Sequence, residues 1–170
     1  MENPHSILKK VFGYDSFRPG QEEIVSRLLA GQDVLAVMPT GAGKSVCYQV
    51  PAVVMEGMAL VVSPLVSLMA DQVRAVQEAG IRGAYLNSTL APGQQAEVLR
   101  RAAEGAYDLM YVAPERLADP RFAEFARTAR LALIAVDEAH CVSQWGQDFR
   151  PSYLSIGQFI AELPVRPPVA

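Results

Sequence analysis

The sequence has little of several features that would assign it to a specialised class of protein. It has only two cysteines, Cys47 and Cys141, far apart and without metal-type spacing, so we expect reduced thiols in a reducing compartment. No apolar run reaches the ~18–20 residues that a membrane helix needs, and residues 1–5 lack the charged-then-apolar pattern of a signal peptide. We therefore expect a cytoplasmic protein.

The chain also lacks an excess of positive charge. Lysine and arginine number 15 against 18 aspartates and glutamates, and with a net charge of −3 the overall electrostatics do not favour nucleic acid as a partner. Any contact with phosphate must come from a local patch. Twelve of the basic residues are arginine, which suits bidentate contacts with phosphate and stacking on planar groups.

The sequence does have a regular alternation of short apolar runs and amphipathic segments. With 170 residues, 51% of them hydrophobic, the chain is long enough for a single domain over 1–170. Apolar runs without alternation are typical of strands buried on both faces. Their repetition with helices predicts an α/β fold with a parallel central sheet flanked by helices. We expect strands near 33–38, 59–62, 83–86, 108–112 and 131–136.

Proline and glycine mark the ends of the predicted helices. Asn3-Pro4 begins a short first helix, Pro19 begins the second, and Gly31 ends it. A helix that begins at Lys44 should end or kink at Pro51. The remaining helices are predicted near 65–80, 93–104, 120–129 and 152–162.

A glycine-rich segment lies between the first predicted strand and the helix that follows it. Its residues are Thr40, Gly41, Ala42, Gly43, Lys44 and Ser45. The two glycines allow backbone N–H groups to converge on phosphate oxygens. Lys44 can reach the β- and γ-phosphates of a nucleotide, and the Ser45 hydroxyl can bind Mg²⁺. Met38 stands where the strict phosphate-binding pattern has glycine, and an ordinary glycine-rich turn is the alternative.

Two acidic residues follow the last predicted strand. Asp137 can hold Mg²⁺ directly or through water, and Glu138 can position and deprotonate an attacking water. Two solvated acids at a strand end are the alternative. The glycine loop and these acids both lie beyond the carboxyl ends of strands, where parallel sheets bind ligands. Together they predict nucleotide hydrolysis, with His140 as a coupling residue or a satisfied histidine at the edge of the sheet.

The segment from Phe12 to Gln21 can supply contacts to a nucleotide base. The Gln21 amide offers a donor and an acceptor that fit the N6/N7 edge of adenine, and Tyr14 or Arg18 can stack on the base. The alternative is packing of the aromatic side chains under the N-terminal helix, which is favoured for Phe12 and Phe17.

The segment from Cys141 to Pro151 holds the only tryptophan of the chain. Trp145, Phe149 and Arg150 place two aromatic rings and a guanidinium beside the acidic residues. Such a loop can stack on unpaired bases. The alternative is a tryptophan that covers the edge of the sheet.

Polar residues also follow the second, third and fourth predicted strands. Hydroxyls, amides and arginine at this edge suit contacts with a nucleic-acid backbone. Each of them alone is better explained as a helix cap or turn residue, so the prediction depends on their repetition. The residues are Ser63, Asn87, Ser88, Thr89 and Arg116.

Taken together, these segments resemble the first motor domain of RecQ-type DNA helicases of superfamily 2, over essentially the whole chain. The glycine loop is the helicase form, Pro-Thr-Gly-x-Gly-Lys-Ser, with Ala42 in place of the more frequent glycine. The last segment is the most specific, because it resembles the aromatic-rich loop that separates this family from other DExH helicases. The matching segments are 12–14, 17–21, 38–45, 47–49, 63–65, 67–69, 71–73, 87–89, 111–117, 137–140 and 141–150.

The resemblance implies a three-layer P-loop NTPase (RecA-like) domain and 3′→5′ DNA unwinding driven by ATP and Mg²⁺, in recombination and repair. The segment before and including Gln21 would hold adenine, and the glycine loop would hold the phosphates. Lys44 and the two acids would be catalytic. The Trp145 loop would sense single-stranded DNA and, with His140, report it to the ATP site.

The family also has a second motor domain that carries arginine fingers. We expect that domain in the same longer chain, because residues 165–170 look like a turn that leads into a further strand. Single-stranded or partly duplex DNA is the expected partner, with nucleoid association if the protein is bacterial. A nucleotide- or DNA-binding module without catalysis is the alternative. An RNA helicase of the DEAH group is disfavoured by the Trp145 loop and by residues 17–21.

Overall fold

The computed structural model describes residues 3–36, 44–137, 155–161, 163 and 167–169. Within these ranges four parallel strands form one sheet, in the order β2-β3-β1-β4. The strands are β1 (Met58–Val62), β2 (Gly83–Leu86), β3 (Leu109–Val112) and β4 (Leu131–Val136). They coincide within a residue with four of the five predicted strands, so the predicted parallel sheet is confirmed.

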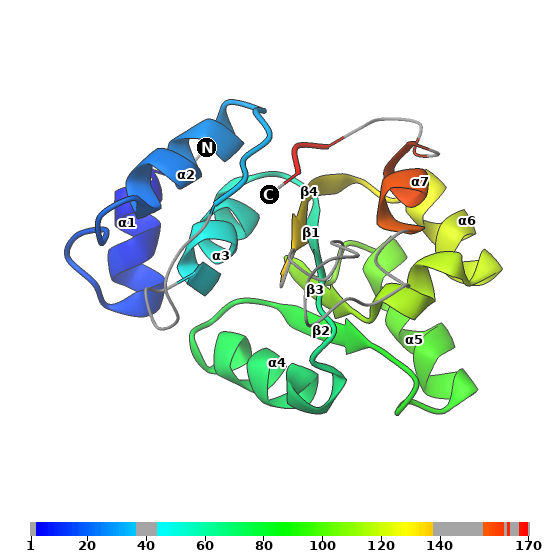
Figure 1. Ribbon diagram of the computed structural model, residues 1–170. Coiled ribbons are helices and arrows are strands. Elements are labelled where there is room, and N and C mark those ends of the chain that lie inside the picture. The colour runs from blue at the N-terminus through cyan, green and yellow to red at the C-terminus, as the bar shows by residue number, and fades with distance from the viewer. Residues whose placement is uncertain (1–2, 37–43, 138–154, 162, 164–166, 170) are drawn as a thin grey trace.

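Helices cover both faces of this sheet and make three layers (Figure 1). On one side lie α3 (Lys44–Val54) and α4 (Met69–Glu78), and on the other lie α5 (Pro92–Ala103), α6 (Pro120–Thr128) and α7 (Ser155–Ala161). Outside α3 pack α2 (Gln21–Leu29) and α1 (Pro4–Ile7), which continues into a π-helical turn over Leu8–Phe12. Short 3-10 turns cover Val66–Leu68 and Pro114–Ala118. None of the described helices has the length and apolar character required to span a membrane.

Alternate residues of each strand face opposite helical layers, as the pleat of a strand requires. Leu60 and Met110 face α5, α6 and α7, where Phe122 joins the same cluster. Val61 and Tyr111 face α3 and α4. All five side chains are buried, so the sheet is covered on both faces as its apolar sequence predicts.

Glycine ends α2 and α4 in the same way. Gly31 and Gly80 have φ angles of 81° and 91°, in the left-handed region that glycine adopts without steric cost. After each glycine, the next N–H bonds back into the last turn: Gln32 to Arg27 O, and Ile81 to Val76 O. These are Schellman caps, and they confirm the predicted helix ends at both glycines.

Two helix boundaries predicted from proline differ in the structure. Pro19 does not begin the second helix, because Gly20 intervenes with φ of 87° and α2 begins at Gln21. Pro51 does not end α3, which continues to Val54, and a kink at Pro51 stays a prediction. Proline removes one backbone donor, but Val50 and Ala52 beside Pro51 are buried, and their packing outweighs that local preference.

The first predicted strand is not assigned as a strand over its described part, residues 33–36. The N–H of Val34 donates to Val169 O at 2.9 Å, and Val169 forms a parallel bridge with Ile134 of β4. Residues 167–169 therefore lie beside β4. Leu35 is 83% exposed, so the expected burial on both faces is wrong at this position: no described element covers that side chain.

Candidate functional site

The carboxyl ends of the four strands lie at one edge of the sheet. Val62 pairs with Val112 on one side and with Val136 on the other, and Leu86 pairs with Val112. The next residues are therefore neighbours: Ser63 N–H donates to Val112 O at 3.1 Å, and Asp137 N–H donates to Val62 O at 2.9 Å. This alignment brings Ser63, Asn87, the start of the Pro114–Ala118 turn, and Asp137 to the edge where ligands bind in parallel sheets.

The first turn of α3 exposes its two polar residues. Lys44 and Ser45 are exposed, whereas every residue from Val46 to Ala52 is buried. An exposed ammonium and hydroxyl at a helix N-terminus suit a phosphate with its metal ion. The helix begins at Lys44, as the sequence predicted. Residues Thr40 to Gly43 of the glycine loop lie outside the described residues, so the convergence of their N–H groups stays a prediction.

A buried hydrogen-bond network connects that first turn to β3. The Tyr48 and Tyr111 hydroxyl oxygens are 3.1 Å apart, and Gln49 Nε2 donates to the Tyr111 oxygen at 3.2 Å. Tyr48 lies one helical turn after Ser45 in α3. Burial is the main cause that raises the pKa of both tyrosines, and the negative charge of Asp137 adds to it. The hydroxyls thus stay protonated, and Asp137 lies within electrostatic reach of the pair.

The oxygen donors at this edge fit Mg²⁺. Asp137 is half-buried directly after β4, and Ser45 is exposed in the first turn of α3. Mg²⁺ prefers oxygen ligands and usually keeps several waters. Proteins therefore commonly supply only one or two of its ligands, here one carboxylate and one hydroxyl, and nucleotide phosphates supply others. The described residues contain no cluster of three or more His, Cys, Asp or Glu that could hold a metal ion, so such an ion would also need phosphate or water ligands.

Cys47 lies beside this network and is a buried thiol rather than half of a disulfide. Burial raises its pKa to about 11, so it is protonated at neutral pH. This agrees with the expectation of a reduced cysteine.

The predicted adenine-binding residues are close in space but differ in exposure. Tyr14 is 50% exposed and Arg18 is exposed, whereas Gln21 is only 3% exposed. Gln21 Oε1 accepts from the Arg18 N–H at 2.8 Å, which fixes the orientation of the amide. The alternative of aromatic packing holds for Phe17, whose ring meets that of His5 edge-on at 5.1 Å.

Two of the predicted backbone-contact residues have local roles in this structure. Ser63 is fully buried and its hydroxyl accepts from Leu65 N–H at 3.2 Å. Asn87 is 1% exposed, and its Oδ1 accepts from both the N–H and the hydroxyl of Thr89. Both residues shape the turns after their strands, in line with the turn alternative. Ser88 and Thr89 are exposed, so their side chains remain accessible from the surface.

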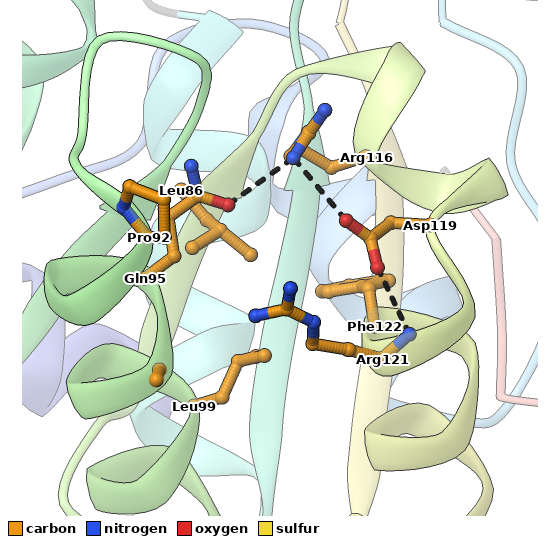
Figure 2. A pocket seen from close by; sticks show the side chains of 9 residues that line it. Leu86, Pro92, Gln95, Leu99, Arg116, Asp119, Arg121 and Phe122 are labelled. Carbon is orange, nitrogen blue, oxygen red and sulfur yellow. Dashed lines mark hydrogen bonds and ion pairs between the residues drawn. The ribbon is translucent and has the colours of Figure 1, made fainter.

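Arg116 is held on the surface by two side chains (Figure 2). Its Nη1 donates to Gln95 Oε1 at 3.1 Å and to Asp119 Oδ2 at 3.3 Å. These residues line a cavity of about 150 Å³ together with Arg121 and Phe122. Asp119 also caps α6 by accepting from the Arg121 N–H at 2.9 Å, so the arginine is attached to a rigid helix start.

The comparisons with known proteins agree with this arrangement. The family model described as DEAD/DEAH box helicase matches residues 18–168. The chain belongs to the DEAD/DEAH box helicase family.

Within this helicase family, the chain is similar to several proteins named ATP-dependent DNA helicase RecQ. It is 48% identical to those of Haemophilus influenzae, over 97% of this chain, and Bacillus subtilis, over 98% of it. The predicted resemblance to RecQ-type helicases is confirmed. The chain spans only 27% and 28% of the length of these two relatives.

Solved structures confirm the helicase fold. A hypothetical ATP-dependent RNA helicase from Sulfolobus tokodaii aligns with 99% of this chain and 49% of its own, at a TM-score of 0.74 and 20% identity. The DUF1998 helicase MrfA, bound to DNA and AMPPNP, aligns with 82% of this chain and 21% of its own, at a TM-score of 0.65 and 20% identity. At this identity the likeness shows the RecA-like fold alone.

Several predicted site residues of this helicase domain lie outside the described residues. They are Glu138, His140, Trp145, Phe149 and Arg150, together with the loop from Thr40 to Gly43. Conversely, sequence reasoning assigned no role to Tyr48, Gln49 and Tyr111. The signals were present, since Tyr48 and Gln49 follow Ser45 by one helical turn and Tyr111 is a polar interruption in an apolar strand.

Proposed function

We propose that this chain is the ATP-binding half of a DNA helicase motor. It binds ATP with Mg²⁺ and, with a second RecA-like domain of a longer chain, couples hydrolysis to 3′→5′ movement along single-stranded DNA, in recombination or repair. The observation that carries the proposal is that α3 begins with the exposed Lys44 and Ser45 and is bonded to β3 through Tyr48 and Tyr111, in the sheet whose carboxyl edge holds Asp137. The DNA helicase names of the relatives support the choice of substrate.

The chemistry divides among residues at this edge. Lys44 contacts the β- and γ-phosphates, and Ser45 and Asp137 hold Mg²⁺, which when bound neutralises phosphate oxygens. Glu138 accepts the proton of a water that attacks the γ-phosphorus, and the bond to the β–γ bridging oxygen breaks to give ADP and phosphate. Tyr14 and Arg18, with Gln21, hold the adenine.

The DNA contacts lie at the same edge in this proposal. Trp145, Phe149 and Arg150 stack on unpaired bases, and His140 reports their presence to the ATP site. Ser88, Thr89 and Arg116 contact the backbone, with Ser63 and Asn87 shaping the turns behind them. A second RecA-like domain would supply arginine fingers, which are worth ~10³–10⁵ in turnover at related sites.

Substitution of Lys44 tests the nucleotide site. In the full gene product, Lys44→Ala should weaken ATP binding by about 10- to 100-fold, since a charged hydrogen bond to phosphate contributes about 1.5–3 kcal/mol. A fluorescent ATP analogue measures the affinity, and hydrolysis is measured with single-stranded DNA and with RNA. Lys10→Ala is the matched control, because Lys10 is also exposed but lies on the π-helical turn before Gly13.

Each result decides between functions. Loss of binding in Lys44→Ala alone, with hydrolysis stimulated by DNA and not by RNA, supports the proposal. An unchanged titration in Lys44→Ala would remove the phosphate-site assignment. Lys44-dependent binding without any hydrolysis would instead support a nucleotide-binding module.

A further inference from the structure

A cavity of about 150 Å³ lies between α5 and the first turn of α6, near the ends of β2 and β3 (Figure 2). Leu86, Leu99 and Phe122 supply apolar walls. Arg116 and Arg121 bring two positive charges to the same cavity. Sites for whole small molecules are usually larger, roughly 300–1,000 Å³, so this cavity suits one charged group of a larger ligand.

Arg116 is held in place by two groups that are themselves anchored. Its Nη1 donates to Gln95 Oε1 at 3.1 Å and to Asp119 Oδ2 at 3.3 Å. Gln95 Nε2 donates to Leu90 O at 2.9 Å, and Asp119 Oδ1 caps α6. The Nε and Nη2 groups of Arg116 have no partner among the described residues, so their N–H donors remain available to an anion.

Arg121 differs from most described arginines because no carboxylate neutralises its charge. Its guanidinium forms no ion pair or hydrogen bond with any described residue, and only its backbone N–H is bonded, to Asp119. Figure 2 shows its side chain reaching from α6 across the cavity toward α5. By contrast, ion pairs with carboxylates are formed by Arg27, Arg74, Arg82, Arg100, Arg101 and Arg130.

The charge of this cavity is opposite to that of the whole chain. Two arginines and one aspartate line it, which leaves one positive charge, whereas the chain has a net charge of −3. In an acidic chain, contact with phosphate requires such a local patch. Guanidinium groups present paired N–H donors that fit two phosphate oxygens at once, so phosphate is the group that the cavity fits best.

The stability of α6 does not account for Arg121. The residue lies in the first turn of the helix, where a positive charge opposes the helix dipole. Its side chain is exposed and therefore adds little buried area. Asp119 already caps the helix through its side chain. A ligand at the cavity explains an arginine at this position better than helix stability does.

We propose that Arg121 and Arg116 form a subsite for one backbone phosphate of single-stranded DNA. The inference rests on the proposed function and adds Arg121 to its DNA contacts. Arg116 follows β3 and Asp137 follows β4, with β1 between them, so roughly 10 Å separates the two positions at the usual strand spacing. The subsite therefore contributes to the affinity for DNA and leaves the affinity for nucleotide unchanged.

The test measures binding of a fluorescent single-stranded oligonucleotide by the full gene product, by anisotropy at several salt concentrations. Arg121→Gln should weaken binding by about 10-fold, the worth of one charge-assisted hydrogen bond. The slope of log K against log salt should become shallower by about 0.7, the contribution of one phosphate contact on a single strand. Arg121→Lys keeps the charge, so it should keep the slope and lose only part of the affinity.

Arg127→Gln is the matched control. Arg127 is exposed in the last turn of the same helix, roughly 9 Å farther along, and does not line this cavity. The substitution removes the same charge from α6, so it should leave the DNA affinity and the salt slope unchanged. Circular dichroism establishes that each variant is folded, and ATP binding without DNA should be equal in all of them.

The outcomes separate this inference from the function on which it rests. Equal effects of Arg121→Gln and Arg127→Gln, or a loss of affinity with an unchanged salt slope, would overturn the subsite while the proposed function stands. Unchanged DNA binding in Arg121→Gln would also overturn it and would leave the cavity to an acidic side chain of a protein partner. If the unchanged protein did not bind single-stranded DNA, the DNA part of the proposed function would fail together with this inference.

Discussion

The two faces of the central sheet are built from different chemistry. Toward α5, α6 and α7 the buried members of the cluster are apolar, with the partly buried Tyr107 packed against them, and Phe122 meets Phe125 and Phe159 with ring centroids 5.8 and 5.7 Å apart. Toward α3 and α4 the cluster contains Tyr48 and Tyr111, joined through their hydroxyls. Both faces are buried to a similar degree, so exposure does not explain the difference.

The chemical difference between the two faces follows from their position relative to the candidate nucleotide site. The first turn of α3 exposes Lys44 and Ser45 at the candidate nucleotide site. The first turns of α5, α6 and α7 hold no lysine beside a serine. We expect the apolar face to contribute mainly stability, whereas the tyrosine face also ties α3, which begins with Lys44 and Ser45, to β3. Three experiments can break or sharpen this comparison.

The largest effect is expected from Phe122→Ala on the apolar face. Phe122 is 1% exposed, and removing a buried phenylalanine ring costs about 3–5 kcal/mol through lost burial and the cavity left behind. Urea unfolding at neutral pH measures the change. The nucleotide affinity of the folded fraction should stay within twofold of the unchanged protein, roughly the resolution of a titration. A Mg²⁺-dependent loss of affinity in Phe122→Ala would contradict the division between the two faces.

A smaller effect is expected from alkaline pH on the tyrosine face. The pKa of Cys47 is raised from 9.0 to about 11 by burial, and burial also raises the pKa of both tyrosines. Groups with a raised folded pKa contribute stability below the unfolded pKa and lose it as pH rises through the folded value. Stability should therefore fall above about pH 9, by the order of 2–3 kcal/mol for Cys47 alone. Chemical unfolding from pH 7 to 11 checks this prediction.

A tyrosine variant assigns part of that pH dependence. Tyr111→Phe removes one titrating group, so its stability should fall less steeply above pH 10, the ordinary value for tyrosine. If Tyr111→Phe and the unchanged protein had the same profile, the alkaline loss would not come from the buried pair.

The smallest effect is expected from Glu97→Gln on the exposed surface of α5. Glu97 accepts from Arg100 and Arg101 at 2.6 and 3.0 Å, and these bonds lower its pKa to about 2. Because the folded pKa is depressed, its contribution is present above pH 4.5 and is lost as pH falls toward 2. Exposed pairs are screened by solvent and salt, so the urea midpoint at neutral pH should match that of Glu78→Gln, whose residue is exposed on α4. A clear decrease of the urea midpoint in Glu97→Gln alone would mean that this exposed ion pair contributes measurably to stability.

Local sequence patterns determined most of the architecture. Non-alternating apolar runs predicted four strands, and glycines at positions 31 and 80 predicted helix ends, because burial and backbone freedom act over a few residues. The order of strand and helix then predicted the parallel sheet and the edge that collects Ser45 and Asp137. The family resemblance needed only these local segments.

Tertiary structure decided what each side chain does. Tyr48 and Tyr111 are 63 positions apart, and their contact depends on how α3 docks on the sheet, which no local pattern encodes. The same packing buries Ser63 and Asn87 in their turns, carries α3 through Pro51 and leaves Leu35 exposed. The sequence alone thus determined the elements and the edge that holds the site, since short-range preferences dictate them. The bond between α3 and β3 required the folded chain, because it joins Tyr48 to Tyr111, which are distant in sequence.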